Sequence, residues 1–182
     1  MRQIVIAVTM MLVLATGSVS AFDGNRKGFI LGGGLGVAPV SKWDGGGGFD
    51  ESKAGGGANF IIGYGWNEFN LIVAEGNISA YDSDYGATIY QGFSGACWYH
   101  YFQPPGKAFF TTVGLGSYNF EFEFSGGGSG SNSPGFGLLG GGGYAFTRHF
   151  QAAGYLGWGK TSEPGYDYDH IHLNVLVSVV GF

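Results

Sequence analysis

Eight segments of this chain share a two-residue alternation in which bulky apolar side chains occupy every second position. The segment 57–66 is one example, because Phe60, Ile62 and Tyr64 alternate with the glycines at positions 63 and 65. Successive side chains of a β-strand point to opposite faces, so each segment predicts a strand with one bulky face and one small-residue face. The predicted strands cover residues 28–37, 53–66, 69–79, 87–102, 108–120, 135–146, 150–160 and 171–182.

The composition indicates which face meets the solvent. Glycine accounts for 38 of the 182 residues, aromatic residues for 17% and charged residues for only 12%. A soluble domain of this size needs a more charged surface, whereas a barrel in lipid needs an apolar outer band with aromatic residues at both interfaces. The single cysteine, Cys97, excludes a disulfide framework. We therefore assign one set of residues to the lipid face (Leu35, Ile62, Leu138, Leu156) and another to the interior (Gly34, Gly63, Gly141, Gly157).

Long and short connections alternate between the predicted strands. The short ones are residues 67–68, 103–107 and 147–149, and the long, polar ones are 41–52, 80–86, 121–134 and 161–170. This alternation, with both chain ends on the short-turn side, is typical of an even-stranded outer-membrane barrel. The sequence therefore predicts an all-β fold, an eight-stranded antiparallel transmembrane β-barrel with short periplasmic turns and longer extracellular loops.

The first 21 residues have the pattern of a cleavable signal peptide. Arg2 is followed by a mostly apolar run over residues 4–15, a break at Gly17 and small residues up to Ala21. The apolar run is too short for a membrane-spanning helix, which takes roughly 20 residues. The residue directly after the cleavage site is Phe22 and not a cysteine, which argues against a lipid anchor. We expect residues 1–21 to be removed after Ala21, leaving residues 22–182 as one barrel domain.

These features together resemble the small outer-membrane β-barrels of the OmpA, OmpX and opacity-protein type. The segment 142–150 (GGYAFTRHF) is similar to the strand–turn–strand that precedes the last hairpin in that group, and the chain ends in Phe182. In that family the terminal aromatic residue is the insertion signal for the barrel-assembly machinery. The resemblance therefore implies Phe182 as the assembly signal, and the assembly machinery and periplasmic chaperones as partners. Family members include structural proteins, adhesins and lipid-modifying enzymes, so the resemblance implies architecture rather than one activity.

The interior of the barrel is predicted to be filled by side chains. Eight strands close a barrel just wide enough for this, and large residues can pack over strand glycines. We expect the fourth strand to contribute Tyr90, Trp98 and His100 to the interior, and the fifth to contribute Phe110 and Tyr118. The alternative is a small apolar cavity that could hold an acyl chain.

The last strand leaves its orientation open. Its better apolar line is Ile171, Leu173, Val175, Val177 and Val179, which is not the face that carries Phe182. Either a bulge or an apolar inner wall would explain this arrangement.

Two weak motifs could suggest a cofactor. The glycine runs at 32–34 and 140–143 do not fit the spacing of nucleotide-binding loops. Asp167, Asp169, His170 and His172 have the residue types of a metal site. A solvated loop entering a strand explains the same pattern, because alternate strand residues share a face by default. We predict no metal and no cofactor.

A sharper enzymatic hypothesis comes from outer-membrane barrels that deacylate lipid A with a Ser–His–acid set at the outer rim. The candidate residues for such nucleophilic catalysis are His172, Ser178 and either Glu75 or Glu123. Those enzymes carry a His-x-Ser pair on one strand face, and here Asn174 occupies the position of the nucleophile. We therefore expect no catalytic residues.

Charge is partitioned between the two predicted ends. The long connections hold Asp44, Asp50, Glu51, Asp82, Asp84, Glu121, Glu123, Glu163, Asp167 and Asp169, against Lys42, Lys53 and Lys160. The short-turn side holds Arg26, Lys27, Lys107 and Arg148. An acidic outer rim would repel lipopolysaccharide phosphates unless divalent cations bridged them. No basic patch supports nucleic-acid binding.

We conclude that the sequence describes a monomeric, non-enzymatic protein of the bacterial outer membrane with a structural or surface-interaction role. Its expected partners are outer-membrane lipids and lipopolysaccharide. The alternatives are a lipid-A-modifying, deacylase-like enzyme and a carrier of small hydrophobic molecules.

Deletion of Phe182 should impair assembly, because the terminal aromatic residue is expected to be read by the insertion machinery. Cell fractionation should find the truncated chain in the periplasm instead of the outer membrane. Normal outer-membrane levels of the truncated protein would contradict this assignment.

Overall fold

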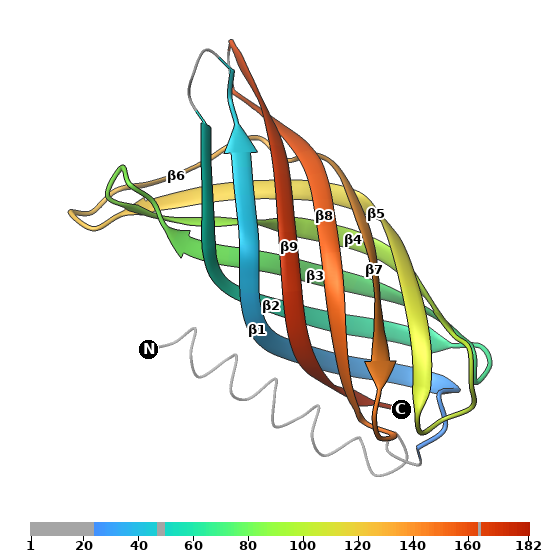
Figure 1. Cartoon of the computed structure of the whole chain (residues 1–182). Helices are drawn as coiled ribbons and strands as arrows, with labels where there is room; N and C mark the ends of the chain where they lie inside the picture. The colour runs from blue at the N-terminus through green and yellow to red at the C-terminus, as the bar shows by residue number, and fades with distance from the viewer. Residues whose placement is uncertain (1–23, 47–49, 164) are drawn as a thin grey trace, which may run out of the picture.

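The computed structural model describes residues 24–46, 50–163 and 165–182, and their strands form one closed barrel (Figure 1). Within these residues, no helix is long and apolar enough to cross a membrane. The expected signal peptide and its cleavage site at Ala21 lie outside the described residues. The strands are β1 (Gly28–Asp44), β2 (Asp50–Gly65), β3 (Asn70–Asp82), β4 (Ala87–Tyr101), β5 (Ala108–Phe124), β6 (Ser129–Ser131), β7 (Gly135–Ala145), β8 (Phe150–Glu163) and β9 (Tyr166–Gly181).

The eight long strands pair in a ring, as the sequence predicts. Each pairs antiparallel with its neighbour along the chain, the first strand pairs with the last, and β4 pairs with β5 to complete the circle. The three-residue β6 adds to the outer part of β5 only. A closed ring leaves no strand edge exposed to lipid, where an unpaired backbone group would find no water.

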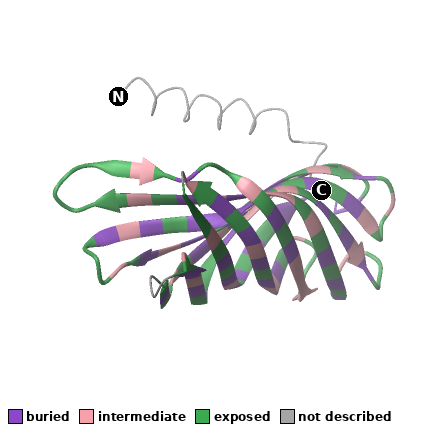
Figure 2. Cartoon of the chain, turned by 90° about the horizontal axis from the view of Figure 1, so that it is seen from above, coloured by how far each residue is buried: buried purple, intermediate pink, exposed green. Residues whose placement is uncertain are grey.

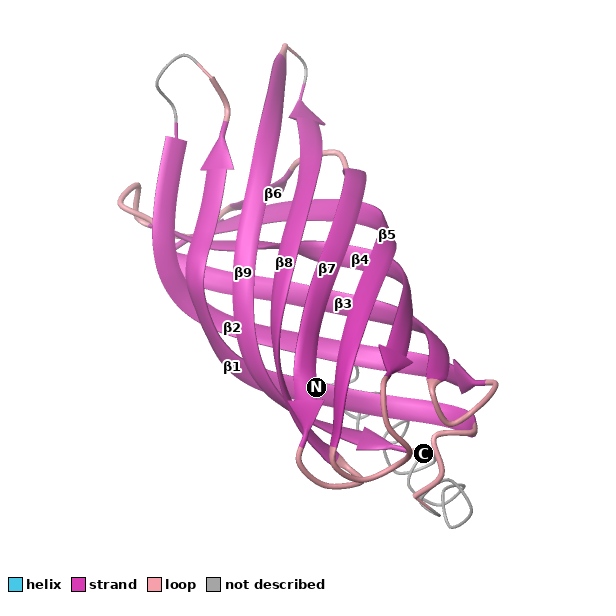
Figure 3. Cartoon of the chain, turned by 45° about the vertical axis from the view of Figure 1, so that its right-hand side comes forward, coloured by secondary structure: helices cyan, strands magenta, loops and turns pink. Residues whose placement is uncertain are grey.

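The extracellular connections are much shorter than expected, because the strands continue into them. The predicted loop 41–52 contains the pairs Trp43↔Glu51 and Asp44↔Asp50, and the predicted loop 161–170 is paired almost to its tip, at Glu163↔Tyr166. Figure 3 shows these hairpins rising as strands at one end, with the short turns at the other. The strands were predicted to end where the sequence becomes polar. This was too early, because a hairpin of polar residues can continue a β-ladder into water.

A bulge at Pro39 explains why the first strand was predicted to end at Val37. The register of β1 shifts between Ala38 and Ser41 against β2, and between Val37 and Val40 against β9. Proline has no N–H to donate to the ladder, so within sheets it occupies bulges and edges. The strand resumes beyond the bulge and carries Trp43 to the extracellular end.

The lipid-facing residues are those predicted from the alternation, and buried and exposed residues alternate along the strands in Figure 2. Leu35, Ile62, Leu138 and Leu156 are exposed on the outside, and Leu35 is 75% exposed. In β9 the line from Ile171 to Val179 faces outward. Its other face buries Leu176, Val180 and Phe182. Both explanations were wrong: β9 runs without a bulge against β8, its apolar line faces lipid, and Phe182 lies on an inward face that also carries His170, His172, Asn174 and Ser178.

The interior is filled, but β4 contributes a different set of aromatic residues from the one predicted. Tyr90 and Trp98 are exposed on the outside, and His100, which has the same strand parity, is only partly buried. The inward face of β4 instead carries Phe93, Tyr99 and Tyr101. Both faces of this strand carry aromatic residues, so alternation alone did not distinguish them. Phe110 and Tyr118 of β5 are buried inside, as predicted.

Glycines of β8 make room for these interior rings. A Cβ at Gly157 would overlap the imidazole of His172, and a Cβ at Gly159 would overlap Tyr118. Both rings are fully buried and hydrogen-bonded to each other, which limits their freedom to move aside. The small residues are therefore required by the packing of the interior.

Gly157→Ala should destabilise the barrel by about 1–3 kcal/mol, the usual effect of overpacking a filled core. Gly154→Ala is the matched control, since Gly154 lies in the same strand and a Cβ there meets no atom within 4 Å. Urea unfolding in lipid vesicles, followed by the heat-modifiable shift on unboiled gels, measures both variants. Equal stability of the two variants would show that the interior is not tightly packed at Gly157.

Candidate functional site: the interior and the two mouths of the barrel

A hydrogen-bonded network of inward-facing polar residues occupies the middle of the barrel. We call it the central network, and its members are Asn59, Glu75, Asn77, Tyr99, Tyr118, Tyr155, His172, Asn174 and Ser178. They come from β2, β3, β4, β5, β8 and β9. All are buried. Burying a polar group costs free energy unless the group forms hydrogen bonds. In the central network the buried polar groups bond to one another, which allows a polar interior without contact with bulk water.

Glu75 is the acidic centre of this network. Its Oε2 accepts a hydrogen bond from the Tyr99 hydroxyl at 2.6 Å. Its Oε1 accepts bonds from the side-chain amides of Asn77 at 3.1 Å and Asn59 at 3.2 Å. Within the described residues, no ion pair involves Glu75. Three neutral donors, rather than a cation, therefore hold this carboxyl group.

The two histidines of β9 have both ring nitrogens engaged. In His172, Nδ1 lies 2.7 Å from the Tyr118 hydroxyl and Nε2 lies 3.2 Å from Asn77 Oδ1. In His170, Nε2 lies 2.7 Å from Thr161 Oγ1 and Nδ1 lies 3.2 Å from Gln91 Oε1. A neutral imidazole satisfies each site by donating to the amide oxygen and accepting from the hydroxyl. Both rings are thus fixed as structural groups.

Arg26 closes the periplasmic mouth. Its Nη1 donates to the carbonyl oxygen of Gln103 at 2.8 Å and to that of Glu68 at 3.4 Å. Its guanidinium carbon lies 3.7 Å from the centroid of the Tyr101 ring, a cation–π contact. Gln103 and Glu68 belong to two different periplasmic turns, so Arg26 ties the segment before β1 to both. Burial lowers the pKa of Arg26, but an arginine remains charged at any physiological pH.

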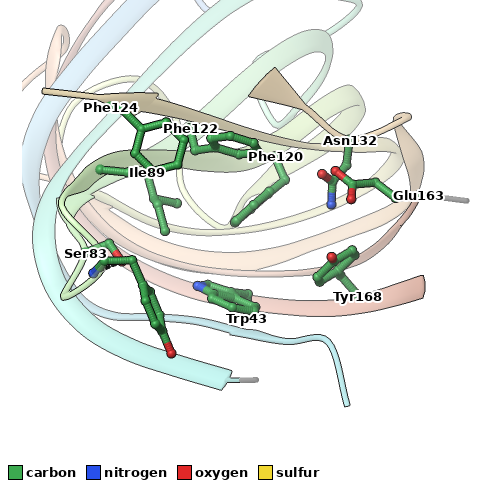
Figure 4. Close-up of a pocket in the computed structure, with 11 residues that line it drawn as sticks. Trp43, Ser83, Ile89, Phe120, Phe122, Phe124, Asn132, Glu163 and Tyr168 are labelled. Carbon is green, nitrogen blue, oxygen red and sulfur yellow. Dashed lines mark hydrogen bonds between the residues drawn. The ribbon is translucent and has the colours of Figure 1, made fainter. Parts of the chain in front are cut away.

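The extracellular mouth is lined by aromatic residues. Trp43, Tyr81, Ile89 and Phe120 form a buried cluster there, with Phe122 and Tyr168 packed against it. All of these residues except Tyr81 border a partly open cavity of about 250 Å³, and Figure 4 shows Asn132 and Glu163 at one end of it and Ser83 at the other. The mouth therefore combines an apolar floor with polar groups at its edges.

Acidic residues surround this mouth. The ten acidic residues predicted for the long connections all lie in the extracellular halves of the strands or in the tips between them, together with three lysines. Two of the lysines are already paired, Lys53 with Asp84 at 2.7 Å and Lys160 with Asp169 at 3.1 Å. The extracellular end therefore keeps a net negative charge, as the sequence predicts.

The residues considered for a metal are not brought together, and the catalytic candidates Glu75, His172 and Ser178 share the central network without a direct hydrogen bond between any two of them. His170 and His172 point into the barrel, whereas Asp167 and Asp169 are exposed. Across the described residues, no group of three or more His, Cys, Asp or Glu side chains could hold a metal ion. Ser178 donates to Asn59 Oδ1 at 3.3 Å rather than to a histidine, and Glu123 is exposed at the rim.

Two functional features escaped the sequence. Arg26 was expected only as one of the charges of the short-turn side, where it does lie, and its full burial was not predicted. Its aromatic partner Tyr101 was not assigned to the interior. The alternation along β4 could have placed Tyr101 in the interior, because it lies on the same face of the strand as Phe93, Cys97 and Tyr99. No sequence signal distinguished Arg26 from the adjacent Lys27.

A closed, lipid-facing barrel with short turns at one end and a filled interior defines the class of small outer-membrane β-barrel proteins. The model of the outer membrane protein β-barrel domain family matches residues 9–178. The chain belongs to this family, and the family places it in the bacterial outer membrane.

Solved structures agree on the fold. Ail, the attachment invasion locus protein of Yersinia pestis, is 14% identical, with 86% of this chain and 99% of Ail covered at a TM-score of 0.56. Ail has also been solved with the heparin analogue sucrose octasulfate. Neisserial surface protein A is 16% identical, with 84% of this chain and 97% of that protein covered at a TM-score of 0.58. Among curated proteins, no sequence matches this chain significantly.

Arg26→Ala should destabilise the barrel by about 2 kcal/mol, the scale of hydrogen bonds from a charged donor. Lys27→Ala is the neighbouring control and should change stability by less than about 0.5 kcal/mol, because Lys27 is exposed. Urea unfolding in vesicles compares the two variants. A smaller loss of stability for Arg26→Ala than for Lys27→Ala would show that the contacts of Arg26 at the periplasmic mouth do not stabilise the fold.

Proposed function

We propose that this protein is a non-enzymatic, monomeric barrel that acts at the cell surface by docking positively charged partners onto its acidic extracellular end. The observation that carries the proposal is the excess of acidic residues there, ten against three lysines. Carboxylates that are concentrated at one end of a molecule attract cationic partners and speed their association.

The filled interior supports a surface role over transport. The buried rings of Phe93, Tyr99 and Tyr155 and the central network occupy the middle of the barrel, and Arg26 occupies the periplasmic mouth. A carrier of small hydrophobic molecules would need a continuous apolar path, and the polar groups around Glu75 interrupt it. A deacylase-like activity has no support from geometry, since Ser178 and His172 each bond to other residues.

The charge of the extracellular end favours a ligand opposite in sign to the one seen with Ail. Sucrose octasulfate is a polyanion, and Ail has been solved with it. Here an anionic partner, including the phosphates of lipopolysaccharide, would need divalent cations as a bridge. We therefore expect direct binding of polycations, and binding of polyanions only when Ca²⁺ or Mg²⁺ is present.

Fluorescent polylysine should bind the purified barrel in phosphatidylcholine nanodiscs, and the affinity should fall as salt screens the charges. Glu121→Gln combined with Glu123→Gln should weaken binding at least threefold, because both carboxylates are exposed on the outer part of β5. Glu68→Gln, at a periplasmic turn, is the control and should leave binding unchanged. Heparin that binds as tightly as polylysine without divalent cations would refute the proposal.

A further inference from the structure

We propose that the aromatic cavity at the extracellular mouth is a binding site for a small organic cation, a quaternary or primary ammonium group on a compact apolar body. This inference concerns a discrete pocket rather than the charge of the whole rim. It rests on three observations: the arrangement of the rings, carboxylates at the cavity edge and behind Trp43, and an indole N–H that lacks a well-formed partner.

The rings form a continuous π surface. The centroid of Trp43 lies 6.0 Å from that of Phe120 and 6.0 Å from that of Tyr168, and the Phe120 and Tyr168 rings are nearly parallel, 6.3 Å apart. Aromatic faces attract cations within about 6 Å of their centroids, and cages of such rings recognise quaternary ammonium groups. In Figure 4, Trp43 and Tyr168 lie on one side of the cavity, with Phe120, Phe122 and Ile89 on the other.

A buried carboxylate lies next to this surface. Glu51 is the cross-strand partner of Trp43, so both side chains point to the interior. Glu51 is only 7% exposed, and its Oε1 accepts a hydrogen bond from the Asp84 backbone N–H at 2.8 Å. Its Oε2 has no hydrogen-bond partner among the described residues, and Lys53, which pairs with Asp84, interacts with Glu51 only through its charge. Glu51 is not among the residues that line the cavity, whereas Glu163 is. A cation in the cavity would therefore meet Glu163 directly and be attracted by the charge of Glu51 from behind Trp43.

The indole N–H of Trp43 is a further group that a ligand could reach. It makes no well-formed hydrogen bond within the described residues, although Trp43 is only 8% exposed. Its polar neighbour is the hydroxyl of Tyr81, which is not among the residues that line the cavity. Buried donors of this kind normally have partners. A hydroxyl or carbonyl group on a ligand beside Trp43 would supply one.

The size and surroundings of the cavity narrow the class of ligand. Its volume of about 250 Å³ lies just below the roughly 300–1,000 Å³ of typical small-molecule sites, so the ligand is small. A second hollow of about 220 Å³ shares Trp43 and Tyr168 and adds Gly45 and Tyr166, which extends the aromatic surface toward solvent. Glu163 at the edge disfavours anions. His170 packs against two residues of the cavity wall, with its ring centroid 4.9 Å from that of Phe120 and 6.4 Å from that of Tyr168, and it stacks on Tyr118 at 5.1 Å.

Choline and its uncharged isostere 3,3-dimethylbutan-1-ol test the proposal, because they share shape and hydroxyl group and differ in charge. Titration of each into the full barrel in nanodiscs, followed by the NMR shift of the Trp43 indole N–H, measures the affinities. Choline should bind at least fivefold more tightly than the isostere. The lipid-facing Trp98 indole should not shift with either compound.

Glu51→Gln should weaken choline binding about fivefold and leave the isostere unaffected, since glutamine keeps the acceptor for the Asp84 N–H and removes only the charge. Tyr168→Leu should weaken choline binding three- to tenfold. Glu121→Gln, on the outer face of β5, is the control and should have no effect. The heat-modifiable gel shift confirms that each variant is folded.

Equal affinity for choline and the isostere would overturn the proposal, as would choline binding that is unchanged in both Glu51→Gln and Tyr168→Leu. Absence of choline binding at millimolar concentrations would also overturn it. None of these results would affect the docking of polycations on the rim, which depends on Glu121 and Glu123. If polylysine did not bind while choline did, the proposed function would fail and the proposal of a cation site in the cavity would stand.

Discussion

The structure depends on one constraint, that every backbone N–H and C=O in the hydrocarbon layer must bond to another part of the chain. A ring of eight antiparallel strands meets it, because the first strand pairs with the last and no edge remains. Closure then fixes the two faces of every strand. Lipid selects residues such as Leu35 and Leu156 for the outside, and the narrow interior selects glycine wherever a neighbouring strand inserts a ring. The pattern in the sequence is a consequence of this closure.

The interior differs strongly between its two ends. At the periplasmic mouth a single buried cation, Arg26, donates to the carbonyls of two turns through Nη1 and lies over the face of Tyr101, while its Nε and Nη2 have no hydrogen-bond partner within the described residues. At the extracellular mouth a buried carboxylate, Glu51, keeps an oxygen without a partner beside a group of aromatic rings. The two ends therefore bury charges of opposite sign. The proposed activity lies at the surface end because the acidic rim and the aromatic cavity are both there.

The fold could be predicted almost entirely from the sequence, because a period of two and alternating connection lengths are direct results of barrel geometry. The alternation of residues along a strand could not decide between two arrangements that share the two-residue period. The first strand was predicted to end at Val37, just before the bulge at Pro39, and both faces of β4 carry aromatic residues. The candidate site was less predictable. Arg26 and Glu51 appear in the sequence as ordinary surface charges, and only the three-dimensional positions of Tyr101 and Trp43 give them buried surroundings.

The central network also has a consequence for how the chain folds. The bonds around Glu75 are local, since they join residues of β2, β3 and β4 that are at most 24 positions apart. The bonds to β9 are distant: 54 positions separate Tyr118 from His172, 97 separate Asn77 from Asn174, and 119 separate Asn59 from Ser178. Contacts between such distant residues form slowly. The first strands can therefore satisfy Glu75 among themselves, whereas the rest of the network is completed only when the last strand pairs with the first.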